Sequence, residues 1–188
     1  MTDGEERCHC AAMTDAPTLH TERLTLRAHR LSDLDDSVAL WQDPVTVKFI
    51  TGGQIQDEQA VWFRILRHAG LWSLFGYGSW VVADRKTGAY VGSAGLLESR
   101  RGIPELEGCP EIGWAVRSQL AGQGLATEAV AATLAWADVH VDAPATRCIV
   151  DPDNRPSIKV AEKCGFHETA RVRNGEIPLI LFERNRGG

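Results

Sequence analysis

Residues 111–141 read EIGWAVRSQLAGQGLATEAVAATLAWADVHV, and the rest of the chain is best understood from this stretch. Its apolar start predicts a strand, Gly122 and Gly124 predict a tight turn, and the remaining residues predict a helix. Apolar residues recur at helical spacing in that last part, at Ala126, Val130, Leu134, Ala137 and Val141. The helix therefore presents one apolar stripe to a core.

The turn is a candidate phosphate-binding site. A helix that begins directly after a turn leaves backbone N–H groups unpaired at its start, where the helix dipole adds partial positive charge. Gly122 and Gly124 would let a phosphate approach these donors closely. A nucleoside-triphosphate loop would need Gly-Lys-Ser/Thr, but Leu125 follows Gly124. A dinucleotide fingerprint would need Gly or Ala where Thr127 stands. An ordinary tight turn without a ligand stays open as an alternative.

The residues around this turn resemble the GNAT superfamily of acetyl-coenzyme-A-dependent N-acetyltransferases. That superfamily has a turn of the form Gln/Arg-x-x-Gly-x-Gly/Ala between its fourth strand and the next helix. The corresponding residues here are Ala121, Gly122, Gln123, Gly124, Leu125 and Ala126. Gly124 and Ala126 match the pattern, whereas Ala121 replaces the usual Gln or Arg. The segments EIGW (111–114), NRPS (154–157) and EKCGF (162–166) resemble the Rim-type branch, the ribosomal-protein alanine acetyltransferases.

The resemblance covers about residues 19–184 and implies an α+β fold. We expect the GNAT acyl-CoA N-acyltransferase architecture, with a mixed, mostly antiparallel seven-stranded sheet flanked by about four helices. The patterns along the chain give the order β-α-α-β-β-β-α-β-α-β-β, which is the GNAT order. Residues 18–188 should form this single domain, and residues 1–17 should form a disordered tail because they are polar and lack periodicity. Ser32 and Asp35 predict a capping box at the first helix.

Composition narrows the functional classes. The net charge of −5 argues against nucleic acid binding through a broad basic face, whereas a cationic amine substrate would be tolerated. The sequence contains neither an apolar run long enough to span a bilayer nor a signal peptide, so we expect no membrane association. The five cysteines form no CxxC pair, which favours reduced thiols and a cytoplasmic location. Cys8, His9 and Cys10 lack a second pair of ligands, so we expect no metal site.

Acetyl transfer from a thioester to an amine requires a held thioester, a stabilised oxyanion, a deprotonated amine and a protonated thiolate. The resemblance implies that acetyl-CoA is the co-substrate, with its pyrophosphate on the turn amides and its pantetheine arm along residues 114–117. The Val116 N–H would then be the oxyanion donor. The implied cofactor-binding residues are Trp114, Ala115, Val116, Arg117, Ala121, Gly122, Gln123, Gly124, Leu125, Ala126, Thr127, Asn154 and Ser157.

Two side chains are candidate catalytic residues. Glu111 matches the Rim-type glutamate that is assigned as general base, although a strand-end residue that pairs with an arginine is an equal alternative. Glu105 and Glu107 are further candidates, either as bases or as an acidic lip that attracts an ammonium group. Ser157 takes the place of the tyrosine that protonates the thiolate in many GNAT enzymes. Alternatively, Ser157 and Asn154 merely start a helix.

The sequence therefore predicts an acetyl-CoA-dependent N-acetyltransferase that acts by direct transfer. Its acceptor would be a primary amine, either a small molecule or a protein N-terminus. A non-catalytic acyl-CoA-binding module is the main alternative, because Ala121 departs from the motif and a tyrosine acid is missing. A nucleotide- or dinucleotide-binding protein is a more remote alternative. Exposed aromatic residues would suit a homodimer interface or a substrate lid, and the candidates are Trp62, Trp72 and Phe75.

Overall fold

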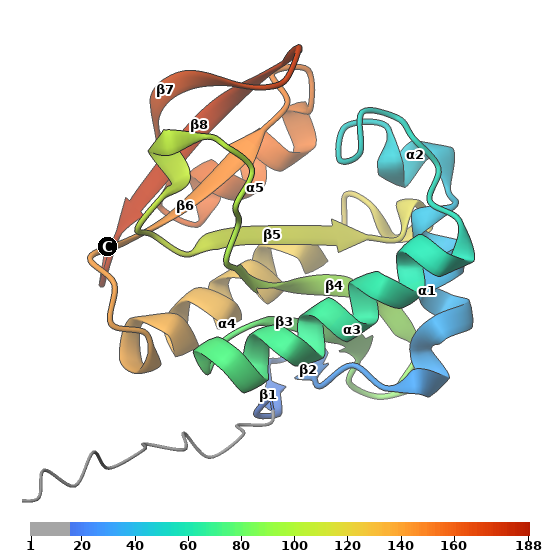
Figure 1. Cartoon of the computed structure of the whole chain (residues 1–188). Helices are drawn as coiled ribbons and strands as arrows, with labels where there is room; N and C mark the ends of the chain where they lie inside the picture. Colours follow the sequence, from blue (N-terminus) through green and yellow to red (C-terminus); the bar gives the residue numbers. More distant parts are fainter. Residues whose placement is uncertain (1–15) are drawn as a thin grey trace, which may run out of the picture.

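The computed structural model describes residues 16–188 and shows one sheet with helices on both faces (Figure 1). Predictions for residues 1–15, including the Cys8-His9-Cys10 cluster, lie outside the described residues. The strands are β1 (Leu19–His20), β2 (Leu24–Arg27), β3 (Ser79–Asp84), β4 (Tyr90–Leu97), β5 (Glu111–Val116), β6 (Ala145–Val150), β7 (His167–Asn174) and β8 (Ile177–Asn185). Their order in the sheet is β1-β2-β3-β4-β5-β6-β8-β7. All neighbouring pairs are antiparallel except β5 and β6.

The helices are α1 (Leu34–Trp41), α2 (Pro44–Val47), α3 (Glu58–Phe75), α4 (Leu125–His140) and α5 (Arg155–Lys163). They cover the two faces of the sheet. Ala115 of β5 packs in one cluster with Val61 of α3, whereas Ile112 packs in another with Val130 of α4. Since neighbouring side chains on a strand point to opposite faces, Glu111 and Ala115 face the α3 layer.

The predicted fold class is confirmed, but the element counts differ. The described chain has eight strands and five α-helices, where the sequence predicts seven and about four. The extra strand, β1, has two residues and is too short to show an alternating pattern. The extra helix, α2, is one turn long. The Asp43 carboxylate starts it by accepting a hydrogen bond from the Val45 N–H at 3.0 Å.

Two local predictions are wrong. The first helical turn is not organised by Ser32, because Asp33 is buried there and accepts a hydrogen bond from the Arg30 N–H at 2.7 Å.

Trp72 is not exposed either: it is 4% accessible and meets Trp80 and Trp136 edge to face. An aromatic residue near the end of an amphipathic helix can face either way, and here α3 turns Trp72 towards the sheet.

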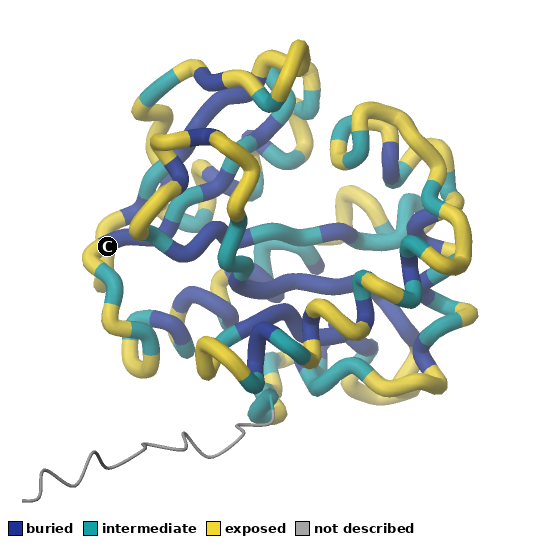
Figure 2. Tube along the Cα trace, in the orientation of Figure 1, coloured by how far each residue is buried: buried dark blue, intermediate teal, exposed yellow. Residues whose placement is uncertain are grey.

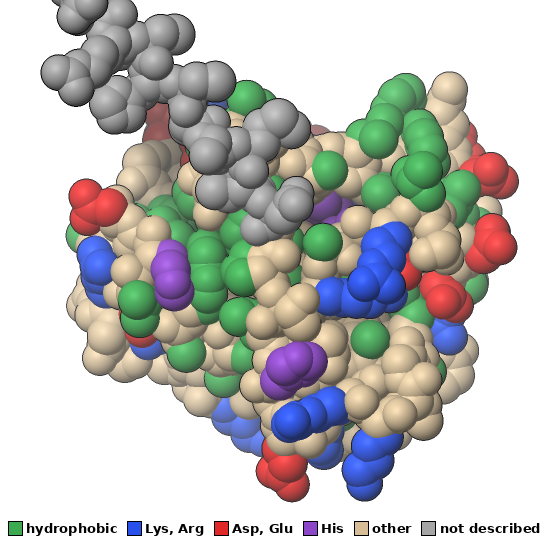
Figure 3. Space-filling view, turned by 90° about the horizontal axis from the view of Figure 1, so that it is seen from below, with side chains coloured by type: hydrophobic (Ala, Val, Ile, Leu, Met, Phe, Trp, Pro, Cys, Tyr) green, Lys and Arg blue, Asp and Glu red, His purple; other side chains and the backbone are tan. Residues whose placement is uncertain are grey.

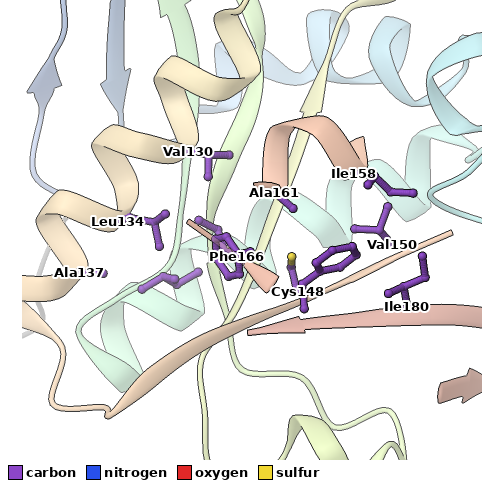
Figure 4. Packing of buried hydrophobic residues seen from close by; sticks show 12 residues of the cluster. Val130, Leu134, Ala137, Cys148, Val150, Ile158, Ala161, Phe166 and Ile180 are labelled. Carbon is purple, nitrogen blue, oxygen red and sulfur yellow. The ribbon is translucent and has the colours of Figure 1, made fainter. Parts of the chain in front are cut away.

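The main core lies between the sheet and the α4–α5 layer (Figure 4). Val130 and Leu134 of α4 meet Ala161 of α5 and Phe166, and Cys148 of β6 lies beneath them. Figure 2 shows the central strands as the most buried part of the chain. The apolar stripe predicted for residues 126–141 is confirmed in outline, since α4 buries Val130, Leu134 and Ala137.

Two glycines in β4 allow the central strands to pair. A Cβ atom at Gly92 would lie 2.0 Å from the Ala115 carbonyl oxygen, and one at Gly95 would lie 2.3 Å from the Ser79 Cα. The sequence suggests close backbone approach by some neighbour at these positions. The neighbours are the adjacent strands of the same sheet.

Candidate active site

The sheet opens between β5 and β6. These parallel strands form a single bridge, Glu111 opposite Arg147. The Arg117 N–H donates to the Val91 carbonyl of β4 at 2.9 Å, so the alternate amides of Trp114 and Val116 point away from β4. Beyond the bridge, the described residues of β6 do not pair with this edge. The Val116 N–H therefore faces the opening, where an extended ligand could take the place of a strand.

The glycine turn lies at the end of this edge. Gly122 and Gly124 both have φ of +78°, and α4 starts directly after Gly124 without a side-chain cap. The first intrahelical bond runs from the Glu128 N–H to the Gly124 carbonyl at 3.1 Å. The amides of residues 125–127 therefore have no helical acceptor, as expected for a helix start. The residues present fit a pyrophosphate, because backbone N–H groups are left without helical acceptors at the helix start and no Cβ covers the turn at its two glycines.

An arginine that the sequence analysis missed lies beside this turn. Arg23 donates from Nη1 to the Gln123 carbonyl at 2.9 Å and from Nε to the Glu128 carboxylate at 2.6 Å. Burial of Glu128 favours its protonated form, but hydrogen bonds from Thr21 and Arg23 outweigh this effect and lower the pKa of Glu128, so its carboxylate is charged at neutral pH. Arg23 thus brings a cation to the turn whose motif lacks one at Ala121. About 100 residues separate the two segments in sequence, and no local pattern links them.

A cavity of about 650 Å³ lies on the α3 side of β5. Its walls come from α3, from the loop around residues 49–52, from β4 and β5, and from the β7–β8 hairpin. Gly52 and Ile177 approach each other across its rim, since a Cβ at Gly52 would lie 3.2 Å from the Ile177 Cδ1. The cavity reaches the open edge of the sheet, because Trp114, Asn154 and Ser157 also line it.

Glu111 lies in the wall of this cavity and is 4% exposed. One carboxylate oxygen, Oε1, lies 3.1 Å from Nη2 of Arg101. The other, Oε2, is buried and has no hydrogen-bond partner among the described residues. A buried carboxylate oxygen without a donor is costly, which makes it a natural acceptor for a ligand N–H or a water molecule. One oxygen of the side chain is thus paired with an arginine, and the other is available to accept a hydrogen bond.

The other predicted catalytic residues are placed differently. Ser157 and Asn154 line the cavity, but the Asn154 Oδ1 also accepts from the Ser157 N–H at 3.2 Å and caps α5. Both interpretations of this pair therefore have structural support. Glu105 and Glu107 are exposed in the loop before β5, and neither lines the cavity.

The two tyrosines of the chain do not line the cavity either. Tyr77 donates to the Glu98 carboxylate at 2.9 Å, and burial raises its pKa further above the usual range. Tyr90 is buried and meets Ser37, and burial raises its pKa to about 12. Neither phenol is placed to act as the acid for a leaving thiolate.

Charged side chains outside the cavity show no single dominant sign on the face seen from below. In Figure 3, Lys and Arg are interspersed with Asp and Glu on that face. Within residues 16–188, no helix combines the length and apolar character that crossing a bilayer requires.

Comparisons with known proteins agree with this geometry. A family model described as "Acetyltransferase (GNAT) domain" matches residues 23–167. The N-acetyltransferase p20 of Bacillus licheniformis, itself described as uncharacterized, is 29% identical over 160 residues, which cover 85% of this chain and 87% of p20. An acetyltransferase structure from Agrobacterium tumefaciens superposes with a TM-score of 0.79 at 26% identity, covering 91% of this chain and 95% of that one.

The fold is also shared with RimL, described as a ribosomal L7/L12 α-N-protein acetyltransferase and solved in complex with coenzyme A. Its TM-score is 0.73 at 15% identity, and the match covers 88% of this chain and 95% of that one. At this identity, the match shows a shared fold. The chain belongs to the GNAT family of acetyltransferases.

Proposed function

We propose that this acetyltransferase moves an acetyl group directly from acetyl-CoA to a primary amine. Three features support the proposal. The turn amides of residues 125–127 and Arg23 can hold a pyrophosphate, the open edge of β5 can pair with an extended pantetheine arm, and the cavity can admit an amine. RimL, which shares the fold, is described as a coenzyme A complex. These features meet along residues 111–117.

The buried carboxylate of Glu111 carries the mechanistic part of the proposal. Glu111 lines the cavity, its Oε2 is buried without a hydrogen-bond partner among the described residues, and the carboxylate would take the proton of the incoming ammonium, directly or through one water. The free amine would then attack the thioester carbonyl to give a tetrahedral oxyanion; as the C–S bond breaks, the cationic nitrogen loses its second proton, and the coenzyme A thiolate leaves and takes up one proton as the thiol. The Val116 N–H stabilises the oxyanion, and one such donor typically contributes about 10²–10³ in rate. Ser157 would donate a hydrogen bond to the departing sulfur.

The test is Glu111→Gln, which keeps the shape and an acceptor for Arg101 but removes the base. Turnover should fall by at least about 100-fold, as expected for the loss of a general base, while coenzyme A affinity stays within about 2-fold. Glu107→Gln is the matched control, because Glu107 is exposed and lies outside the cavity wall. Equal pH–rate profiles for Glu111→Gln and the unmodified protein would reject the base assignment.

A non-catalytic acyl-CoA-binding module remains the second candidate, and one observation favours it: neither tyrosine lines the cavity. Mass detection of acetylated products across amines and peptides separates the two. Binding of acetyl-CoA without any product would favour the binding module. Ser157→Ala adds information, because a loss of turnover with unchanged folding would place the hydroxyl in the reaction.

A further inference from the structure

The cavity wall opposite β5 contains an excess of positive charge. Four arginines line the cavity, together with three acidic residues. Arg101 is already paired with Glu111, and the exposed Arg100 lies 3.8 Å from Glu98. Arg64 and Arg67, one turn apart on α3, have no carboxylate within ion-pair distance among the described residues.

Arg64 is held in place although it lacks a partner. Its guanidinium carbon lies 3.8 Å from the centre of the Trp41 ring, a stacking distance that fixes the plane of the group. Its Nε atom is buried and makes no hydrogen bond within the described chain. Burial, together with the charges of Arg67 and Arg101, lowers the pKa of Arg64 to about 10, which leaves it protonated at neutral pH.

A partly buried guanidinium with a buried, unused donor is costly unless a ligand compensates for it. Arg64, Arg67 and Arg101 influence one another electrostatically, and Glu111 is their acidic neighbour in the cavity. Four arginines line the cavity against three carboxylates, and the two arginines on α3 have no ion-pair partner among the described residues, which leaves room for a further anion. A carboxylate suits the planar fork of an arginine, which can bind it through two parallel hydrogen bonds.

We infer that the acceptor is a primary amine that also carries a carboxylate, with the carboxylate bound by Arg64 and Arg67 and the amine directed to Glu111. This assignment rests on the proposed acetyl transfer and adds the class of its acceptor. It also opposes the idea of an acidic lip for cations, because Glu105 and Glu107 lie outside the cavity wall. Polycationic amines should be poor acceptors, since their second charge would meet the arginines.

The experiment compares acceptors that differ only in the carboxylate. One arm uses free amino acids against their amides, and the other uses peptides with Asp or Glu near the amino terminus against Asn or Gln peptides. The two arms distinguish a free amino acid from an acidic peptide. The unmodified protein should prefer the carboxylate member by about 10- to 100-fold in kcat/KM, the usual effect of a hydrogen bond to a charged group.

Two variants assign the preference to the arginines. Arg67→Gln changes an exposed side chain and should fold normally, and Arg64→Lys keeps the charge but removes the planar fork. Both should reduce the preference, measured as the ratio of kcat/KM for the carboxylate member to that for the amide member, at least about 10-fold. Arg171→Gln is the control, because Arg171 is an exposed arginine on β7 that pairs with Glu168 at 2.7 Å, away from the cavity.

The outcomes separate this inference from the proposed function. Turnover with equal rates for carboxylates and amides would overturn the inference and leave acetyl transfer intact. If no amine is acetylated, each acceptor is titrated into the coenzyme-A-bound protein and its binding is measured by calorimetry. Binding of the carboxylate member but not of the amide member supports the arginine site. Equal binding of the two overturns it. Loss of coenzyme A binding would overturn both proposals.

Discussion

Replacement of Gly124 by Ala tests the proposed pyrophosphate site most directly. Gly124 has φ of +78°, a conformation that costs an L-residue about 1–2 kcal/mol. The added Cβ would have its nearest neighbour, Arg23 Nη2, at 3.6 Å, which is an ordinary contact. The destabilisation therefore comes from the backbone alone. For a chain of this length it corresponds to a fall in Tm of roughly 2–8 °C.

Gly124→Ala should weaken coenzyme A binding more than it lowers the stability of the fold. The new methyl group would lie 3.6 Å from Nη2 of Arg23, on the side of the turn where the proposed phosphate would bind. Loss of one hydrogen bond to a charged group costs about 1.5–3 kcal/mol. The Kd for coenzyme A should therefore rise by about 10- to 100-fold.

Gly88→Ala provides the matched control. Gly88 has φ of +75°, and a Cβ atom there would have no neighbour within 4 Å. It lies in the turn between β3 and β4, so the backbone penalty is the same but the cofactor site is not involved. Calorimetric titration with coenzyme A and thermal unfolding would be measured for both variants. The reasoning is refuted if Gly124→Ala and Gly88→Ala lose similar stability and bind coenzyme A equally well.

The remaining predictions concern stability. Gly92→Ala should cost more than about 3 kcal/mol and often prevent folding, because its Cβ would overlap the Ala115 carbonyl, whereas Gly70→Ala in α3 should stabilise by about 0.5–1 kcal/mol. Denaturant unfolding measures both, and similar effects of the two substitutions would contradict the packing argument. Burial lowers the pKa of His29 to about 4 and that of the stacked His68 well below its usual range. The unfolded chain then binds more protons between about pH 4 and 6.5, so stability is fully present above that window and falls as pH decreases through it, by up to about 3 kcal/mol for His29. Urea titrations at pH 7 and 4.5 check this, and His29→Phe should flatten the dependence; parallel curves for the two proteins would exclude it.

Local patterns predicted the elements around the turn well. The helix expected after Gly124 runs from Leu125 to His140, and the strand before it runs from Glu111 to Val116. Spacing of apolar residues fixes such elements, since each must bury one face, and glycine at positive φ fixes the turn between them. Elements of about one period, such as β1 and α2, show no repeating pattern of apolar residues that could be detected in the sequence.

Site residues were predictable only where they belong to a motif. The turn and residues 154–157 could be placed by resemblance, and the structure locates Asn154 and Ser157 in the cavity wall. Their chemical roles remain predictions. Arg23 and Arg64 were missed, because a single arginine in a strand or helix has the same local pattern whether it is exposed or lines a cavity.

The sequence by itself determined the order of the elements, the conformation of the glycine turn and the family resemblance, because these depend on neighbours within a few residues. Only the tertiary structure decided which residues far apart in the sequence come into contact. The divergence of β5 from β6 exposes the Val116 amide, and packing of α3 across the sheet brings Arg64 and Arg67 into the same cavity as Glu111. Charge and desolvation depend on these distant contacts, and sequence spacing does not encode them.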